Sequence, residues 1–240
     1  MLPQSESPHI ATQHPSQPDH VSSKSLRRII KLILTIVIPF CLVTLWNYII
    51  AERNIRFGWL APPVLWIASA ILATTLMGKK LTTLGLNLSN PLYSLKLLLL
   101  ACLISFPAAW AGLQILQYLN FNIPLSIRIE QGLWLNWILY QLFYVAVAEE
   151  IFFRGYLINN LLELTTSSTR HCKWAHVSAI LISACVFALA HVIIQSDLTT
   201  AFLTFLPGLI LAWLFLHTRS LLAPILFHGL ANTFYAFICS

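Results

Sequence analysis

The chain has 240 residues, of which 58% are hydrophobic and only 9% are charged, and its net charge is +6. About a quarter of the residues of a soluble domain are charged, and a soluble fold of this size could not hide so many apolar side chains from water. The composition therefore excludes an ordinary soluble protein. Nucleic-acid binding is not indicated either, because the basic residues are scattered among the connections between apolar segments.

Seven apolar segments follow a polar N-terminus. Residues 1–24 are rich in Ser, Gln, His and Pro, and we predict a disordered polar tail there. A membrane-spanning helix needs about twenty mostly apolar residues, and the apolar runs approach that length. Because these runs are not alternations of apolar and polar residues, helices are favoured over a β-barrel. The predicted spans are 29–50, 59–77, 92–118, 133–157, 176–195, 199–217 and 220–238.

These segments predict an all-α fold, namely a polytopic transmembrane helical bundle of about seven spans, with kinked helices around a polar intramembrane cavity. Kinks are expected at prolines inside the spans, above all at Pro207, which Gly208 follows. We expect one membrane domain overall. Residues 25–132 would form its first three helices, and residues 133–240 would form helices four to seven.

The distribution of Lys and Arg around the spans predicts the orientation. Ten basic residues flank the side on which the first span begins, namely Lys24, Arg27, Arg28, Lys31, Lys79, Lys80, Lys96, Arg170, Lys173 and Arg219. Only Arg53, Arg56 and Arg128 flank the other side. Positive residues gather on the cytoplasmic side, so we predict a cytoplasmic N-terminus and an external C-terminus in a bacterial inner (plasma) membrane. If two segments form one re-entrant helix pair, the C-terminal prediction reverses.

Two adjacent acidic residues, Glu149 and Glu150, stand inside the fourth apolar segment. An acidic side chain at a helix centre costs about 2.5–3.5 kcal/mol on insertion, and neighbours on a helix point about 100° apart. Arg154 follows Glu150 by four residues on the same face. We predict that these two residues form an ion pair, and that Glu149 faces a cavity, where it can accept a proton. The alternative is a purely structural ion pair near the cytoplasmic interface, which leaves the second glutamate unexplained.

Polar residues in the last spans complete the set. His191 lies deep in the fifth span, and His228 and Asn232 lie four residues apart on one face of the seventh. A lone histidine in a membrane often joins two helices by a hydrogen bond. Two histidines, an aligned asparagine and a glutamate pair supply a base, its partner and two oxyanion-stabilising groups, which favours water-mediated peptide hydrolysis. Bringing them together is predicted to extend the fifth helix over residues 172–178, above the membrane.

Three motifs resemble those of the CAAX-protease and bacteriocin-processing (CPBP, or Abi) family of intramembrane proteases. They are the glutamate pair with Arg154, then Phe187-x-x-x-His191, then His228-x-x-x-Asn232. The resemblance covers about residues 140–236, while the earlier spans match only in being apolar. One departure is Arg219, where the family often has Gly. We interpret Arg219 and His176 as solvated residues of cytoplasmic connections.

The resemblance implies a role for each motif residue. Glu149 would be the general base that activates water, and His191 would hold or polarise that water. His228 and Asn232 would stabilise the tetrahedral oxyanion. The second glutamate of the first motif and its arginine would form a structural pair. The resemblance also implies a glutamate-type, metal-independent reaction, and no HExxH motif is present. We therefore expect no cofactor; the alternative is a zinc ion held by Glu149, His191 and His228.

The predicted function is that of an intramembrane endopeptidase, a CAAX prenyl endopeptidase-like enzyme acting near the cytoplasmic leaflet. Its partners would be a protein or peptide substrate, including membrane-anchored ones, and the lipid bilayer, with no nucleic acid. Prenylated CAAX peptides, leader peptides and C-terminal sorting tails all stay open as substrates. Two other functions stay open as well. One is a non-enzymatic bacteriocin-immunity or membrane scaffold protein. The other is a proton-coupled transporter, which the lack of an internal repeat disfavours.

Overall fold

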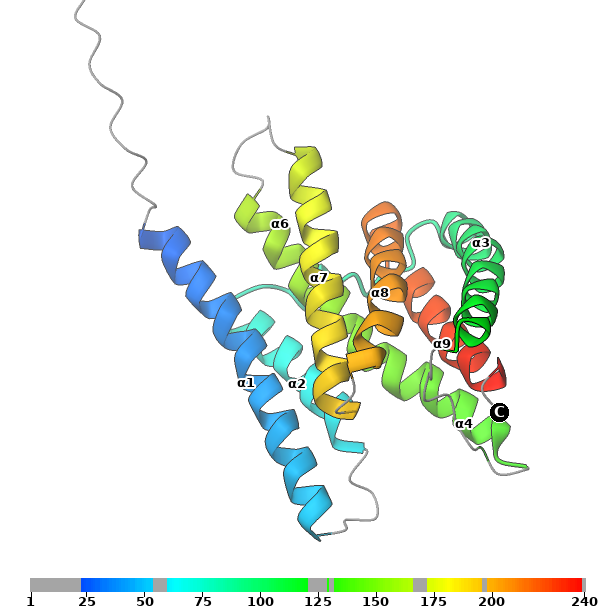
Figure 1. The fold of residues 1–240 in the computed structure, drawn as a ribbon. Coiled ribbons are helices and arrows are strands. Elements are labelled where there is room, and N and C mark those ends of the chain that lie inside the picture. Colours follow the sequence, from blue (N-terminus) through cyan, green and yellow to red (C-terminus); the bar gives the residue numbers. More distant parts are fainter. Residues whose placement is uncertain are drawn as a thin grey trace, which may run out of the picture.

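The computed structural model describes residues 23–53, 60–120, 129, 132–165, 172–195 and 198–238. These residues contain helices and no strand, which confirms the all-α prediction (Figure 1). The first half contains α1 (Ser23–Arg53), α2 (Ala61–Leu76), η2 (Leu81–Leu84) and α3 (Pro91–Tyr118). The second half contains α4 (Trp134–Tyr140), η3 (Gln141–Ala146), α5 (Val147–Glu150), η4 (Ile151–Ile158), α6 (Asn159–Thr165), α7 (Cys172–Gln195), α8 (Leu198–Thr218) and α9 (Leu222–Ile238).

Each predicted span corresponds to one helix, except the fourth, which corresponds to a continuous series of helical segments. In the described part of the chain, four helices are long and apolar enough to cross a membrane, at Leu26–Ile50, Pro91–Tyr118, Lys173–Ile194 and Thr199–Thr218. Two shorter apolar helices, α2 and α9, and the series from α4 to α6 account for the other three predicted segments. The chain is therefore an integral membrane protein built as a helical bundle.

Three boundaries bear on the predictions. Helix α1 begins at Ser23, two residues inside the predicted tail, and residues 1–22 lie outside the described part of the chain. The fourth segment does not end at residue 157 but continues as helix to Thr165, where Lys79 Nζ holds it by contacts of 2.7 Å to Glu163 Oε2 and 2.8 Å to Asn160 Oδ1. Helix α7 begins at Cys172, so the predicted helical conformation of residues 172–178 is confirmed.

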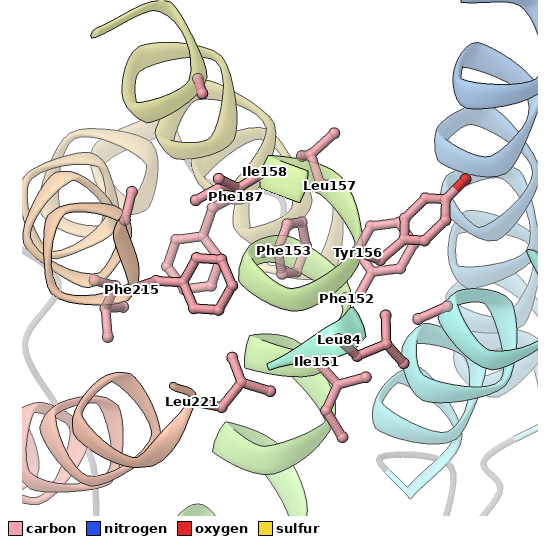
Figure 2. Close-up of a cluster of buried hydrophobic side chains, with 14 of the residues drawn as sticks. Leu84, Ile151, Phe152, Phe153, Tyr156, Leu157, Ile158, Phe187, Phe215 and Leu221 are labelled. Atoms are coloured by element: carbon pink, nitrogen blue, oxygen red, sulfur yellow. The ribbon is translucent and has the colours of Figure 1, made fainter. Parts of the chain in front are cut away.

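The series from α4 to α6 runs diagonally through the bundle (Figure 1). Its segment η4 is buried on every side: all eight residues from Ile151 to Ile158 are buried, which a helix shows only when neighbours surround it. Figure 2 shows the labelled apolar side chains of η4 between Phe187 and Phe215 on one side and helices α1 and α2 on the other. Trp66 of α2 packs on Phe152 and Phe153, with ring centroids 5.0 and 5.3 Å apart.

Two segments of this central helix are π-helical. They are η3 and η4, and they flank the glutamate pair on both sides. A π-helix is wider than an α-helix, is rare, and occurs mostly at functional sites. Ser183 of α7 donates a hydrogen bond of 3.0 Å to the carbonyl oxygen of Phe153, inside the second π segment. The sequence pattern did not predict these segments, because the apolar residues of a helix buried all round carry no face-specific period.

A glycine allows the short η2 helix to reach this centre. A Cβ atom at Gly155 would overlap the backbone carbonyl oxygen of Leu84, the last residue of η2. Glycine at this position therefore sets the approach between η2 and η4. Pro207 lies in the interior of α8, and the kink expected there stays a prediction. Pro224 instead lies in the first turn of α9, where proline removes no helical hydrogen bond, so it is not a kink site.

Candidate active site

The glutamate pair lies at the centre of the bundle, in α5 between the two π-helical segments. Glu149 is 5% exposed and Glu150 is fully buried. Ionised carboxylates in such surroundings require paired charges or hydrogen bonds, because the surrounding side chains cannot solvate them. The partners of each glutamate therefore decide what the site can do.

Glu150 is held by two cationic or proton-donating side chains at one oxygen. Its Oε1 atom lies 2.6 Å from Arg154 Nη1, so the predicted pair of Glu150 and Arg154 is present. The same oxygen lies 2.8 Å from Nδ1 of His228 in α9. Glu150 therefore does more than form an ion pair with Arg154, because it also holds His228 of the third motif in place.

This contact orients the His228 ring. Since a carboxylate oxygen accepts the hydrogen bond, Nδ1 carries a proton. The other ring nitrogen, Nε2, then points toward Glu149 and lies 3.8 Å from its Oε2 atom. At that separation a single water oxygen can lie within hydrogen-bond range of both atoms. The structure thus brings the first and third motifs together around Glu149.

Three buried polar atoms of the first motif have no hydrogen-bond partner among the described residues: Glu149 Oε2, Glu150 Oε2 and Arg154 Nε. Buried polar atoms are nearly always paired, and an unpaired one costs about 1–3 kcal/mol. Three in one place mark a site built for something other than stability. These unpaired atoms do not by themselves show a cavity, so the cavity expected at Glu149 stays a prediction.

The second motif contributes an aromatic ring between the two histidines. Phe187 of α7 is 2% exposed, and its ring centroid lies 4.5 Å from that of His191 and 5.7 Å from that of His228. The guanidinium carbon of Arg154 lies 4.3 Å from the same centroid, which is cation–π distance. Phe187 therefore packs against a residue of each motif. The sequence pattern marked it as part of a motif but gave it no role.

His191 is anchored within its own helix. Its Nδ1 atom lies 3.0 Å from the carbonyl oxygen of Phe187, one turn earlier. No hydrogen bond or ion pair joins His191 to Glu149 within the described part of the chain. The water-holding role that the resemblance implies for His191 accordingly stays a prediction.

Asn232 has a partner that the sequence analysis missed. Its Nδ2 atom donates a hydrogen bond of 2.8 Å to Oε1 of Gln141, the first residue of η3. One N–H of the Asn232 amide is thereby used, and the second is left for another acceptor. The oxyanion role of Asn232 stays a prediction. The signal that could have found Gln141 is its amide within an apolar segment.

The metal alternative has less geometric support. In the described part of the chain, no group of three or more His, Cys, Asp or Glu side chains is placed to hold a metal ion. Glu149 and His228 are close, and the 2.8 Å contact with Glu150 leaves Nε2 as the ring nitrogen of that histidine that could bind a metal. The zinc alternative, with Glu149, His191 and His228 as ligands, accordingly stays a prediction.

Arg219, the departure noted in the last motif region, adopts a backbone φ of +53°. Glycine adopts this left-handed conformation without strain, and arginine does so at a cost of roughly 1–2 kcal/mol. Glycine would therefore suit this turn on backbone grounds alone.

Comparison with known families agrees with this geometry. The model of a family described as type II CAAX prenyl endopeptidase Rce1-like matches residues 131–234. The matched range contains all three motifs and confirms the resemblance to the CAAX-protease and bacteriocin-processing family. No curated protein and no solved structure matches the chain.

Proposed function

From the membership of residues 131–234 in the type II CAAX prenyl endopeptidase Rce1-like family, we propose that the chain is an intramembrane endopeptidase of the glutamate type. It would hydrolyse a peptide bond of a protein or peptide substrate near the cytoplasmic leaflet of a bacterial inner membrane. The N-terminus would be cytoplasmic, as the distribution of basic residues indicates. Prenylated CAAX peptides, leader peptides and sorting tails are the substrate classes to test.

One observation carries the proposal. The His228 ring bridges the two glutamates, with Nδ1 at 2.8 Å from Glu150 Oε1 and Nε2 at 3.8 Å from Glu149 Oε2. A structural ion pair needs only Glu150 and Arg154. Glu149 is the additional glutamate, and its buried, unpaired Oε2 atom faces the oriented imidazole of His228. A carboxylate in this position is suited to act as a general base.

The proposed reaction begins with a water molecule between Glu149 and the scissile carbonyl group. Glu149 takes a proton as the water oxygen bonds to the carbonyl carbon, and His191 helps to hold that water. The negative charge that develops on the carbonyl oxygen is stabilised by His228 Nε2–H and by the second N–H of Asn232. Collapse of this intermediate breaks the C–N bond, and protonated Glu149 gives its proton to the leaving amine.

In this scheme Glu150 is a positioning residue. By accepting the Nδ1–H of His228, its carboxylate fixes the ring so that Nε2 faces the Glu149 side of the site. Arg154 balances the charge of Glu150 and holds its carboxylate in place.

The test is proteolysis by purified protein in detergent or vesicles, with mass spectrometry of a peptide panel drawn from the three substrate classes. Glu149→Gln keeps the shape of the side chain and removes the base, so we expect activity to fall about 10²-fold or more. Glu52→Gln, at an exposed position of α1, should leave activity unchanged. Wild-type activity in Glu149→Gln would overturn the proposed mechanism.

We propose that the reaction requires no metal, as the family resemblance implies and as the lack of an HExxH motif in the sequence indicates. Cleavage should then survive incubation with a strong zinc chelator. Loss of activity with the chelator, restored by added zinc, would contradict this part of the proposal.

A non-enzymatic role has one observation in its favour. Asn232 pairs with Gln141, and His228 pairs with Glu150, as the polar core of a scaffold or immunity protein would also show. Expression of Glu149→Gln in cells that lack the gene separates the two. Full complementation would favour the scaffold, and failure by a stably inserted variant would favour the enzyme.

A further inference from the structure

A polar cavity lies at the end of the bundle where α2 and α8 finish and α7 begins. Its volume is about 410 Å³, and Lys79, His176 and Arg219 line it together with Glu163 and Gly155. None of the catalytic candidates lines this cavity, so it is a different site. His176 and Arg219 were interpreted as solvated residues of separate connections, but Arg219 Nη2 lies 3.4 Å from His176 Nε2.

A second cavity adjoins the first. It has a volume of about 170 Å³ and is lined by Arg28 and Lys31 of α1, with Lys79, Asn160 and Glu163 shared between the two cavities. The ion pair of Lys79 and Glu163, 2.7 Å long, thus stands where the two cavities meet. Three apolar side chains also line the second cavity, namely Leu32, Met77 and Leu164.

The charge of the combined lining is strongly positive. Four cationic side chains and one carboxylate, that of Glu163, line the two cavities, and their net charge is +3. The cations are Arg28, Lys31, Lys79 and Arg219. Arg28, Lys31 and Arg219 form no ion pair within the described part of the chain. A concave surface with such a surplus attracts an anion.

The backbone at Arg219 is strained. The residue is held at a φ of +53°, the left-handed region. Its carbonyl oxygen accepts a 3.0 Å hydrogen bond from Asn87, and the neighbouring Ser220 hydroxyl donates one of 2.6 Å to the Asn87 carbonyl oxygen. Strain maintained by such contacts is typical of binding sites. Here it directs a guanidinium group to the cavity.

We propose that the two cavities form one binding site for the phosphate group of an anionic phospholipid. The basic side chains would hold the headgroup, and Leu32, Met77 and Leu164 would contact the first carbons of the acyl chains. Helix α1 makes lateral entry feasible, since its large side chains Ile29 and Ile33 are 37% and 51% exposed on an apolar outer surface. Basic pockets between transmembrane helices at the cytoplasmic side bind anionic headgroups in this way.

The experiment compares lipids on the full-length protein, stripped of native lipid in an uncharged detergent. Thermal unfolding is measured with phosphatidylglycerol, phosphatidylcholine or inorganic phosphate, and native mass spectrometry counts retained lipid. A ligand that binds only the folded protein raises Tm, here by about 5 °C at saturating phosphatidylglycerol. Phosphatidylcholine and inorganic phosphate should each give a much smaller shift.

Two variants and a matched control locate the effect. Arg219→Gly relieves the backbone strain, so the variant should fold as the wild type does. Because it removes the cation, it should weaken phosphatidylglycerol binding about tenfold. Lys31→Gln should act in the same direction. Lys173→Gln, at an exposed position outside both cavities, controls for general attraction between a basic protein and an acidic lipid, and should bind as wild type does.

Three outcomes would overturn the proposal. Equal Tm shifts with inorganic phosphate and phosphatidylglycerol would assign the site to a soluble anion. Unchanged lipid binding in both Arg219→Gly and Lys31→Gln would show that the cavities are not the lipid-binding site. Equal weakening in Lys173→Gln would leave only non-specific electrostatics.

Discussion

The central helix and the outer helices have similar apolar composition but opposite surroundings. Every residue of η4 is buried, whereas α1 and α3 expose large apolar side chains such as Leu45 at 55% and Leu103 at 64%. In a membrane protein both kinds of helix are apolar, because lipid is as apolar as a protein core. Hydropathy alone therefore does not distinguish the helix that carries chemistry from the helices that face lipid.

Buried polar groups make the distinction. The central helix contains Glu149, Glu150 and Arg154, all buried, while the polar side chains Thr35 and Thr44 of α1 bond to carbonyl groups of their own helix. A polar group satisfied one turn back has no need of a neighbouring helix. A polar side chain whose hydrogen-bond partner lies on another helix holds the two helices together and marks a candidate site. Substitutions at the centre should therefore have larger effects than matched substitutions at the periphery.

The largest effect is expected from Arg154→Met. The guanidinium is fully buried and is 2.6 Å from Glu150, so its removal leaves a buried carboxylate without its cation, which costs about 3–5 kcal/mol. Arg27→Met, at an exposed position of α1, should change stability by less than about 0.5 kcal/mol. Chemical denaturation in detergent measures both. Equal stability of the two variants would show that the central pair is not a structural requirement.

Much of this centre could be predicted because the relevant interactions are local. The pair of Glu150 and Arg154 follows from helix geometry, which places residues four apart on one face. The seven segments follow from the length of apolar runs, since bilayer thickness fixes the length of a span. Sequence alone therefore supplied the fold class and the content of the first motif.

The missing part depends on distance along the chain. The contact from His228 to Glu150 joins residues 78 apart, and the contact from Asn232 to Gln141 joins residues 91 apart. Periodicity says which face a residue occupies, but not which residue of another helix stands opposite. The structural pair that the resemblance implies for Glu150 and Arg154 accordingly did not include His228.

The next effect concerns packing at the centre. Gly155→Ala places a Cβ atom against the carbonyl oxygen of Leu84, a backbone atom that cannot rotate away, so a loss of about 1–3 kcal/mol is expected. Gly112→Ala in α3 is the matched change, since no atom lies within 4 Å of a Cβ atom built there. It should be neutral or stabilising by up to about 1 kcal/mol, because alanine favours helix. Thermal unfolding measures the stability of both variants. A Gly155→Ala variant as stable as the wild type would contradict the close approach of η2 to η4.

A smaller loss of stability and a larger loss of activity are expected for Phe187→Leu. The leucine fills part of the space but lacks the ring that contacts His191, His228 and Arg154, so stability should fall by about 1–2 kcal/mol. Proteolysis should fall about tenfold or more because both histidines lose their lateral support. Phe202→Leu in α8, where the side chain is 63% exposed, should change neither. Unaltered turnover in Phe187→Leu, measured at saturating substrate, would make the ring a packing element only.

The smallest effect is expected where two polar side chains meet at the edge of the centre. Asn232→Ala and Gln141→Ala each remove one half of a 2.8 Å hydrogen bond between α9 and η3, a part-buried contact worth about 1 kcal/mol. If Asn232 only joins helices, both variants and their double mutant should show the same loss of stability and similar activity. If it also stabilises the oxyanion, Asn232→Ala should lower kcat well below that of Gln141→Ala at equal stability. A double-mutant cycle for unfolding, run beside kcat and KM, separates the two roles, because only a group acting on the transition state lowers kcat without a matching change in stability.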